Sequence, residues 1–201
     1  MFTERRTKRS DNTKRPLTEG VGVNDAEYAI SATIDGVEVN CPYYKTWRNM
    51  LKRCYNSKYK EKYPTYKGCK VCDEWLIFSN FKKWMEKQDW KGKQLDKDIM
   101  NKGNKVYSDA NCIFVTEAIN NLILNNNSSR GKYKTGVSYI RSSGKYRAKC
   151  NIKGKSEHIG CFDAEEDAYI AYKKRKNEFI LEVASTCQEP LRTALSKHLI
   201  E

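Results

Sequence analysis

Three short segments in the C-terminal third of the chain alternate apolar and polar side chains, which is the period-two pattern of half-buried β-strands. They are residues 136–141, 145–152 and 155–162. Ser143-Gly144 and Lys153-Gly154 separate them as turns, and a segment with small apolar residues at helical spacing follows. The small residues are Ala164, Ala168 and Ala171, with Tyr172 beside them. We therefore expect a three-stranded antiparallel sheet packed on one helix, which Asp163 caps.

The chain is strongly basic. Its 201 residues include 38 Lys and Arg against 25 Asp and Glu, a formal net charge of +13, together with 13 Tyr and 4 Trp. This balance is typical of nucleic-acid-binding proteins, although a generic basic protein remains the alternative. No segment approaches the ~20 apolar residues of a membrane span, and the N-terminus lacks the apolar stretch of a secretory signal. We expect a cytoplasmic protein without a membrane partner, whose eight cysteines are reduced.

Residues 132–184 resemble the Apetala-type, ethylene-response-factor-like DNA-binding domain. The resemblance rests on Gly136-Val137, on the run Gly144-Lys145-Tyr146-Arg147-Ala148, and on His158-Ile159-Gly160-Cys161-Phe162-Asp163 before the alanine-rich helix. It implies that the sheet, rather than the helix, enters the major groove of double-stranded DNA. Several Arg and Trp residues of the plant members are missing, so the fold carries over better than any base preference.

In a sheet of this kind, alternation places Ala148, Cys150 and Ile152 against the helix and the intervening residues toward DNA. An ordinary solvated face is the alternative. Alternation thus predicts Arg147, Lys149 and Asn151 on the DNA face, and the resemblance implies that Ser138, Ile140, Ser156 and His158 lie there too.

The first half of the chain predicts a hairpin at Asp35-Gly36 and two helices. One helix spans about 43–55, and the other includes Trp75 to Met85 at helical spacing. The apolar face of the first is Tyr44, Trp47, Met50, Leu51 and Cys54, with Lys45, Arg48, Lys52 and Arg53 opposite. We expect Arg48 and Lys52 to contact DNA.

Residues 94–124 have the order strand, loop, strand, helix, with Thr116 capping the helix. Residues 43–125 resemble the HNH-type homing endonucleases of bacteriophages. The resemblance rests on Trp47, Met50 and Arg53-Cys54-Tyr55-Asn56, on Val71-Cys72-Asp73-Glu74-Trp75, on Leu95-Asp96-Lys97-Asp98, and on Gly103-Asn104, Asn111-Cys112 and Asn120.

The resemblance implies a ββα-metal site in which Asp96 and Asn120 hold Mg²⁺ or Mn²⁺. A turn or helix-cap carboxylate is the alternative for Asp96. Lys97 stands where the family has its catalytic His, and an unperturbed Lys is protonated at pH 7, so hydrolysis is in question. Asp98 is a further candidate ligand or base, on the same side as Asp96 if the strand continues.

Cys69-Lys70-Val71-Cys72 is half of a zinc motif, and Cys54 and Cys112 are the candidates for the other half. The alternative, which we favour, is that Cys54, Cys72 and Cys112 act as small buried apolar groups.

We therefore predict an α+β protein in which a ββα-metal, HNH-like domain precedes the sheet-and-helix domain. The predicted parts are a basic arm (1–20), the HNH-like domain with its hairpin and helix (21–124), a linker (125–131), the Apetala-type domain (132–184) and a tail (185–201). The tail docks on the domain, mediates a dimer or frays. The favoured function is a sequence-specific double-stranded DNA-binding protein that does not cleave, such as a transcriptional repressor. The alternative is an active divalent-metal nuclease.

Overall fold

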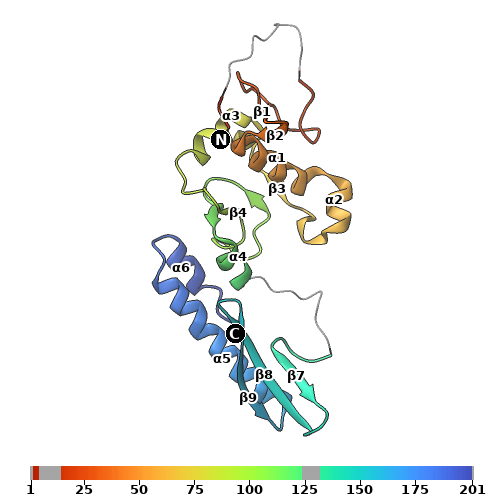
Figure 1. Cartoon of the computed structure of the whole chain (residues 1–201), viewed down its shortest axis with the longest axis vertical. Coiled ribbons are helices and arrows are strands. Elements are labelled where there is room, and N and C mark those ends of the chain that lie inside the picture. The colour runs from red at the N-terminus through yellow and green to blue at the C-terminus, as the bar shows by residue number, and fades with distance from the viewer. Residues whose placement is uncertain (1, 5–14, 124–131, 201) are drawn as a thin grey trace. The chain divides into compact units, whose positions relative to one another are not determined.

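The computed structural model describes residues 2–4, 15–123 and 132–200, and the chain divides into two compact units, Met1–Val115 and Thr116–Glu201 (Figure 1). Both units mix helices and strands, so the α+β class is confirmed. The predicted linker (125–131) and residues 5–14 of the predicted arm lie outside the described residues. None of the helices in the described ranges is long and apolar enough to cross a membrane.

The first unit is built from short elements. In chain order they are β1 (Ser31–Ile34), β2 (Val37–Asn40), α1 (Pro42–Tyr55), α2 (Ser57–Lys62), the 3-10 helix η1 (Pro64–Tyr66), β3 (Lys70–Val71), the 3-10 helix η2 (Asp73–Leu76), α3 (Phe78–Met85), β4 (Gln94–Asp96), β5 (Val106–Tyr107) and β6 (Ile113–Val115). The strands pair as β1-β2 and β4-β6, both antiparallel, and as β3-β5, which is parallel.

The core of the first unit lies between α1 and α3. Trp47, Met50 and Leu51 of α1 are almost completely buried, as their spacing predicts, and so are Phe78 and Phe81 of α3. The indole N–H of Trp47 donates to the carbonyl of Trp75 at 2.6 Å, which satisfies the one polar atom that this side chain buries.

The hairpin predicted at Asp35-Gly36 is confirmed. Strand β1 pairs with β2, and the two turn residues have φ of 51° and 74°. A tight turn with two positive φ values matches the right-handed twist of the flanking strands.

The helix predicted from Trp75 to Met85 is interrupted. Trp75 belongs to η2, Ile77 is extended (φ −95°, ψ 122°), and α3 starts at Phe78. The break coincides with a long-range pairing, because Val23 N–H donates to the Leu76 carbonyl at 2.8 Å and Phe78 N–H donates to the Val23 carbonyl at 3.0 Å.

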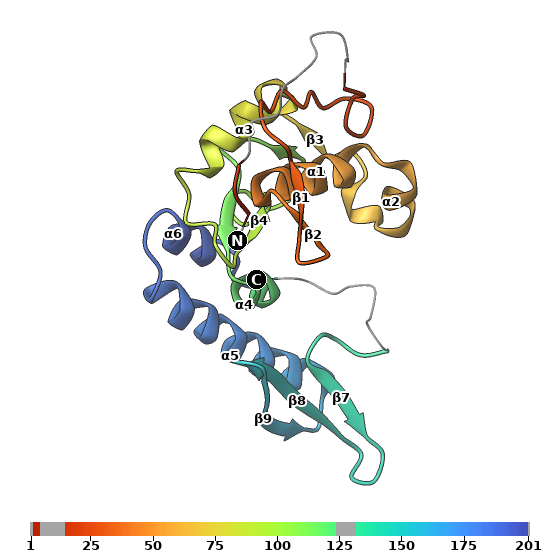
Figure 2. The ribbon, with the colours of Figure 1, turned by 45° about the horizontal axis from the view of Figure 1, so that its top comes forward.

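The second unit contains a sheet covered by a long helix. Its elements are α4 (Glu117–Ile123), β7 (Val137–Ile140), β8 (Lys145–Ile152), β9 (Lys155–Phe162), α5 (Glu165–Ser185) and α6 (Leu191–Ser196). The sheet is antiparallel in the order β7-β8-β9, and α5 runs along one face of it (Figures 1 and 2). The predicted sheet packed on one helix is therefore confirmed.

Small side chains allow α5 to approach the sheet closely. Ala148 of β8 and Ala168 of α5 are fully buried, and Cys150 and Tyr172 belong to the same cluster. Asp163 does not cap the helix as expected. The N-cap residue is Ala164, and the carboxylate of Asp163 instead lies 3.2 Å from the ammonium of Lys145.

The C-terminal half of α5 forms a second small core. Leu122 of α4 packs with Phe179 and Ile180, and α6 buries Leu195 completely. Asn177 donates to the Ile200 carbonyl at 3.0 Å and accepts from the Ile200 N–H at 2.8 Å. Of the three possibilities predicted for the tail, its described residues thus dock on this unit.

Candidate nucleic-acid interface

The strand register gathers the predicted DNA-facing residues on the side of the sheet opposite α5. Directly paired residues of antiparallel strands share a face. The pairs are Ser138 with Arg147, Ile140 with Lys145, Lys149 with His158 and Asn151 with Ser156. None of these side chains is buried, whereas Ala148 and Cys150 between them are. The register therefore places all seven residues on one face of the sheet, and we call this surface the open sheet face.

A β-bulge adds a residue that alternation misses. The register shifts between Ala148 and Lys149, so Ile159 has no direct partner and Cys161 pairs with Arg147. The exposed Cys161 therefore lies on the open sheet face, with its sulfur 4.0 Å from Nε2 of His158. Strict period-two counting from His158 selects Gly160 instead, and nothing in the sequence marks the bulge.

The cations at the centre of the open sheet face are not neutralised. Neither Arg147 nor Lys149 has a carboxylate within 4 Å among the described residues, and Arg147 Nε donates only to the Ser138 hydroxyl at 3.4 Å. Two unpaired cations on adjacent positions of an open sheet suit an anionic partner.

One cation on the helix side of the sheet, Arg175, is neutralised by carboxylates. Arg175 of α5 binds Glu157 of β9 through two nitrogens, at 2.8 and 3.3 Å, and Glu182 at 3.1 Å. The hydrogen bond from Arg175, reinforced by its charge, lowers the pKa of Glu157 below its ordinary value. Arg175 is thus neutralised within the unit, as is Lys145 at the edge of the open sheet face by Asp163, whereas Arg147 and Lys149 at its centre are not.

Asp96 stabilises the turn that follows β4. One carboxylate oxygen accepts the N–H groups of Asp98 at 2.7 Å and Ile99 at 2.8 Å. This is the turn-carboxylate alternative that the sequence left open for Asp96. Strand β4 ends at Asp96, so the premise that placed Asp98 on the same side by strand alternation does not hold.

Lys97 is buried beside that turn. Only 4% of the residue is exposed, and its ammonium donates to the Asp98 carboxylate at 2.6 Å and to the Asn104 carbonyl at 2.8 Å. Asn104 in turn donates to the Lys97 carbonyl at 3.0 Å, so two reciprocal hydrogen bonds join residues 97 and 104 across the loop. The ammonium also lies 5.8 Å from the ring centroid of Tyr107. Lys97 therefore stabilises the conformation of this loop.

One oxygen of each candidate carboxylate is already engaged within the loop. The carboxylate of Asp96 is engaged by its turn, and that of Asp98 is paired with a buried ammonium, which repels a metal ion. The ranges that the structure describes contain no group of three or more His, Cys, Asp or Glu side chains placed to hold a metal. Asn120 lies on α4 in the second unit, while Asp96 lies in the first, so their joint site stays a prediction.

The Thr116 cap of α4 is confirmed, because its hydroxyl accepts the Ile119 N–H at 3.3 Å.

The basic face of α1 is only partly as expected. Arg48 is exposed and Lys52 half-buried, as a DNA contact allows. Arg53 turns inward instead, donating to the Leu95 carbonyl at 3.5 Å and lying 5.7 Å from the ring centroid of Tyr66.

The four candidate zinc ligands do not assemble into a metal-binding group within the described ranges. Cys54, Cys69 and Cys112 are buried, and Cys72 is half-buried. Burial raises the pKa of the Cys54 thiol to about 12. The thiol therefore stays protonated near neutral pH, as expected of a small buried apolar group.

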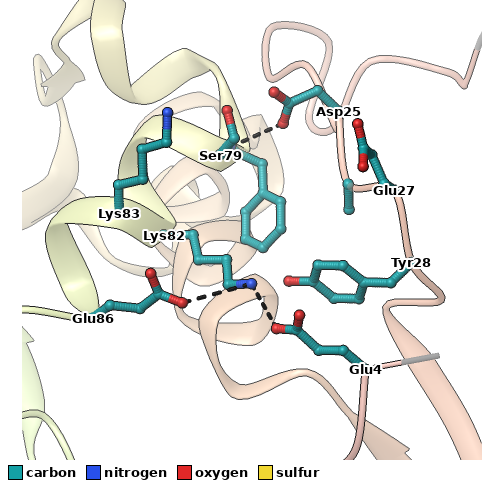
Figure 3. Close-up of a pocket in the computed structure, with 10 residues that line it drawn as sticks. Glu4, Asp25, Glu27, Tyr28, Ser79, Lys82, Lys83 and Glu86 are labelled. Atoms are coloured by element: carbon teal, nitrogen blue, oxygen red, sulfur yellow. Dashed lines mark hydrogen bonds and ion pairs between the residues drawn. The ribbon is translucent and has the colours of Figure 1, made fainter. Parts of the chain in front are cut away.

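An open pocket of about 660 Å³ lies beside α3 (Figure 3). Its lining includes four carboxylates and two lysines. The ammonium of Lys82 lies 2.6 Å from Glu4, 3.6 Å from Glu86 and 4.6 Å from the ring centroid of Tyr28. Because carboxylates outnumber lysines in the lining and Lys82 is already neutralised, this pocket does not favour a polyanion.

Comparisons of the chain with protein-family models, with curated proteins and with solved structures found no match.

Proposed function

We propose that this protein binds double-stranded DNA in a sequence-specific manner through the open sheet face. The observation that carries the proposal is the unpaired state of Arg147 and Lys149, at the centre of a face whose reverse side is covered by α5. A two-stranded or wider β-ribbon fits the major groove, where Arg and Lys side chains bind the acceptors of guanine. The net charge of +13 supports the same partner.

The test uses a duplex site selected from a random pool, with a scrambled duplex for comparison. Arg147→Ala and Lys149→Ala should each weaken binding to the selected site by about 1 to 3 kcal/mol if they contact bases, and should reduce the preference over the scrambled duplex. Lys174→Ala is the matched control, since this exposed cation lies on α5, on the other side of the sheet. Variants that bind both duplexes like the unmodified protein would refute the role of the sheet.

We further propose that the protein occupies its site without cleaving it, as a repressor on a homing-endonuclease scaffold does. The engagement of Asp96 by its own turn and the buried ion pair between Lys97 and Asp98 support this proposal. Lys97, the residue in place of the family's base, is committed to two acceptors in the loop.

The second candidate is a nuclease of the HNH type, and one observation favours it. Strands β4 and β6 pair antiparallel and are followed in sequence by α4, which is the element order of a ββα-metal core. Incubation of supercoiled DNA carrying the selected site with Mg²⁺ or Mn²⁺ separates the two candidates. A non-cleaving protein leaves the DNA intact and still binds it in EDTA. Nicking that Asp96→Ala abolishes would establish the nuclease.

A further inference from the structure

A second basic surface lies on the first unit, around α2. Residues 52–70 contain seven basic residues and a single acidic one, Glu61. The basic residues are Lys52, Lys58, Lys60, Lys62, Lys67 and Lys70, together with Arg53, whose side chain turns inward. Of these residues, only Lys52 is among the DNA contacts predicted from the sequence.

Three tyrosines pack against one another in this segment, and one of them, Tyr66, also packs against the main core. The ring of Tyr59 lies 4.7 Å from that of Tyr63 and 5.8 Å from that of Tyr66, measured between centroids. The ammonium of Lys52 lies 5.5 Å from the Tyr59 ring, and that of Lys62 lies 5.4 Å from the Tyr63 ring. Because aromatic rings attract cations and support their aliphatic stems, the tyrosines gather the basic side chains in one place.

The cations of this surface lack carboxylate partners. In the described ranges, none of the seven forms an ion pair, whereas Lys82, Lys93 and Lys97 of the same unit each do. Lys58, Lys62, Lys67 and Lys70 are exposed. Like charges gathered without counter-charges repel one another, and an external polyanion relieves that repulsion.

We propose that the residues of α2 and its flanks, the lysine–tyrosine surface, bind the phosphate backbone of double-stranded DNA as a contact separate from the open sheet face. The proposal rests on the DNA partner proposed above. Lysine is a mobile point charge that meets phosphates without fixed geometry, and backbone contacts carry no sequence information. The surface therefore contributes affinity for every duplex, and the sheet contributes the preference among duplexes.

The test removes three exposed cations from this surface in the full-length protein, as Lys58→Gln/Lys62→Gln/Lys67→Gln. The matched control removes three exposed cations from α3 and the segment after it, as Lys83→Gln/Lys87→Gln/Lys91→Gln. Figures 1 and 2 both place α3 and α2 on opposite sides of the first unit. Fluorescence anisotropy then measures the binding of each variant to the selected and the scrambled duplex at several salt concentrations. Urea unfolding monitored by tryptophan fluorescence verifies that both variants fold.

Three lost phosphate contacts lower the magnitude of the slope of log K against log salt by about 2.7, since each contact contributes about 0.9. At 0.1 M salt this is a loss of up to about 500-fold in affinity. We expect that loss on both duplexes alike, so that the preference for the selected site is unchanged, and we expect the control to keep the slope of the unmodified protein.

The outcomes separate this proposal from that for the sheet. If the triple variant keeps the full slope while Arg147→Ala loses preference, the lysine–tyrosine surface is refuted and the sheet proposal stands. If the triple variant loses affinity on both duplexes while Arg147→Ala binds like the unmodified protein, the surface stands and the sheet fails. If the unmodified protein binds neither duplex, both are refuted.

Discussion

Gly136, directly before β7, is required by the packing of the sheet on α5. Its φ is +79°, and a Cβ built on it would lie 2.1 Å from Cδ2 of the buried Tyr172. Gly154, in the turn between β8 and β9, also has φ +79°, but a Cβ there meets nothing within 4 Å. The two glycines thus share the same positive φ and differ in their steric surroundings.

We predict that Gly136→Ala destabilises the second unit far more than Gly154→Ala. The left-handed conformation costs an alanine about 1 to 2 kcal/mol at either position, and overpacking against Tyr172 adds about 1 to 3 kcal/mol at Gly136 alone. The expected losses are therefore about 2 to 5 kcal/mol for Gly136→Ala and about 1 to 2 kcal/mol for Gly154→Ala. In a domain of this size each kcal/mol lowers Tm by about 4 to 8 °C.

Urea unfolding followed by far-UV circular dichroism measures both losses. Tryptophan fluorescence provides an internal control, because all four tryptophans lie in residues 47–90 of the first unit. Equal losses in the two variants would refute the argument that Gly136 is needed for the close approach of Tyr172.

Two further predictions concern ion pairs. Arg175 lowers the pKa of Glu157, so their interaction stabilises the fold above the ordinary carboxyl pKa of 4.5, and this stabilisation is lost as pH falls through the lowered pKa. Arg175→Gln should therefore raise the pKa of Glu157 in an NMR titration, and an unchanged pKa would contradict the assignment. Lys97→Met should destabilise the first unit by about 1 to 2 kcal/mol, because it leaves the Asn104 carbonyl without its donor. Lys93→Met, which breaks an ion pair with an exposed carboxylate, should cost at most ~0.5 kcal/mol by tryptophan fluorescence in urea, and equal losses would contradict the structural task of Lys97.

The sheet and the apolar faces of the helices follow from the sequence because each depends on a local period. Alternation along β8 places Arg147 and Lys149 opposite Ala148 and Cys150, and no distant residue alters that assignment. The bulge at Ile159 depends on how two strands accommodate one extra residue, so alternation within β9 alone could not reveal Cys161.

The remaining differences come from long-range contacts. The break before α3 results from pairing with Val23, more than 50 positions away in the chain. Arg53 occupies a helix position that periodicity assigns to solvent, but its long side chain reaches the Leu95 carbonyl. Asp163 could cap α5 by sequence, yet its carboxylate lies beside Lys145. In each case a partner that is distant in sequence outweighs a local preference.

The hydrogen bonds of the loop after β4 could not be predicted from the sequence either. Leu95-Asp96-Lys97-Asp98 has the residue types of a metal site, and the sequence could not show that the N–H groups of residues 98 and 99 occupy an oxygen of Asp96. It also could not show that Asn104 and Lys97 bind each other's carbonyls.

The central claim, that this protein binds duplex DNA through unpaired cations, is tested most directly by the salt dependence of binding to the selected duplex. At least three phosphate contacts predict that log K falls linearly with log salt, with a slope of about −2.7 or steeper, and that the selected duplex binds more tightly than the scrambled one at every salt concentration. A flat titration, or equal affinity for the two duplexes throughout, would contradict the account.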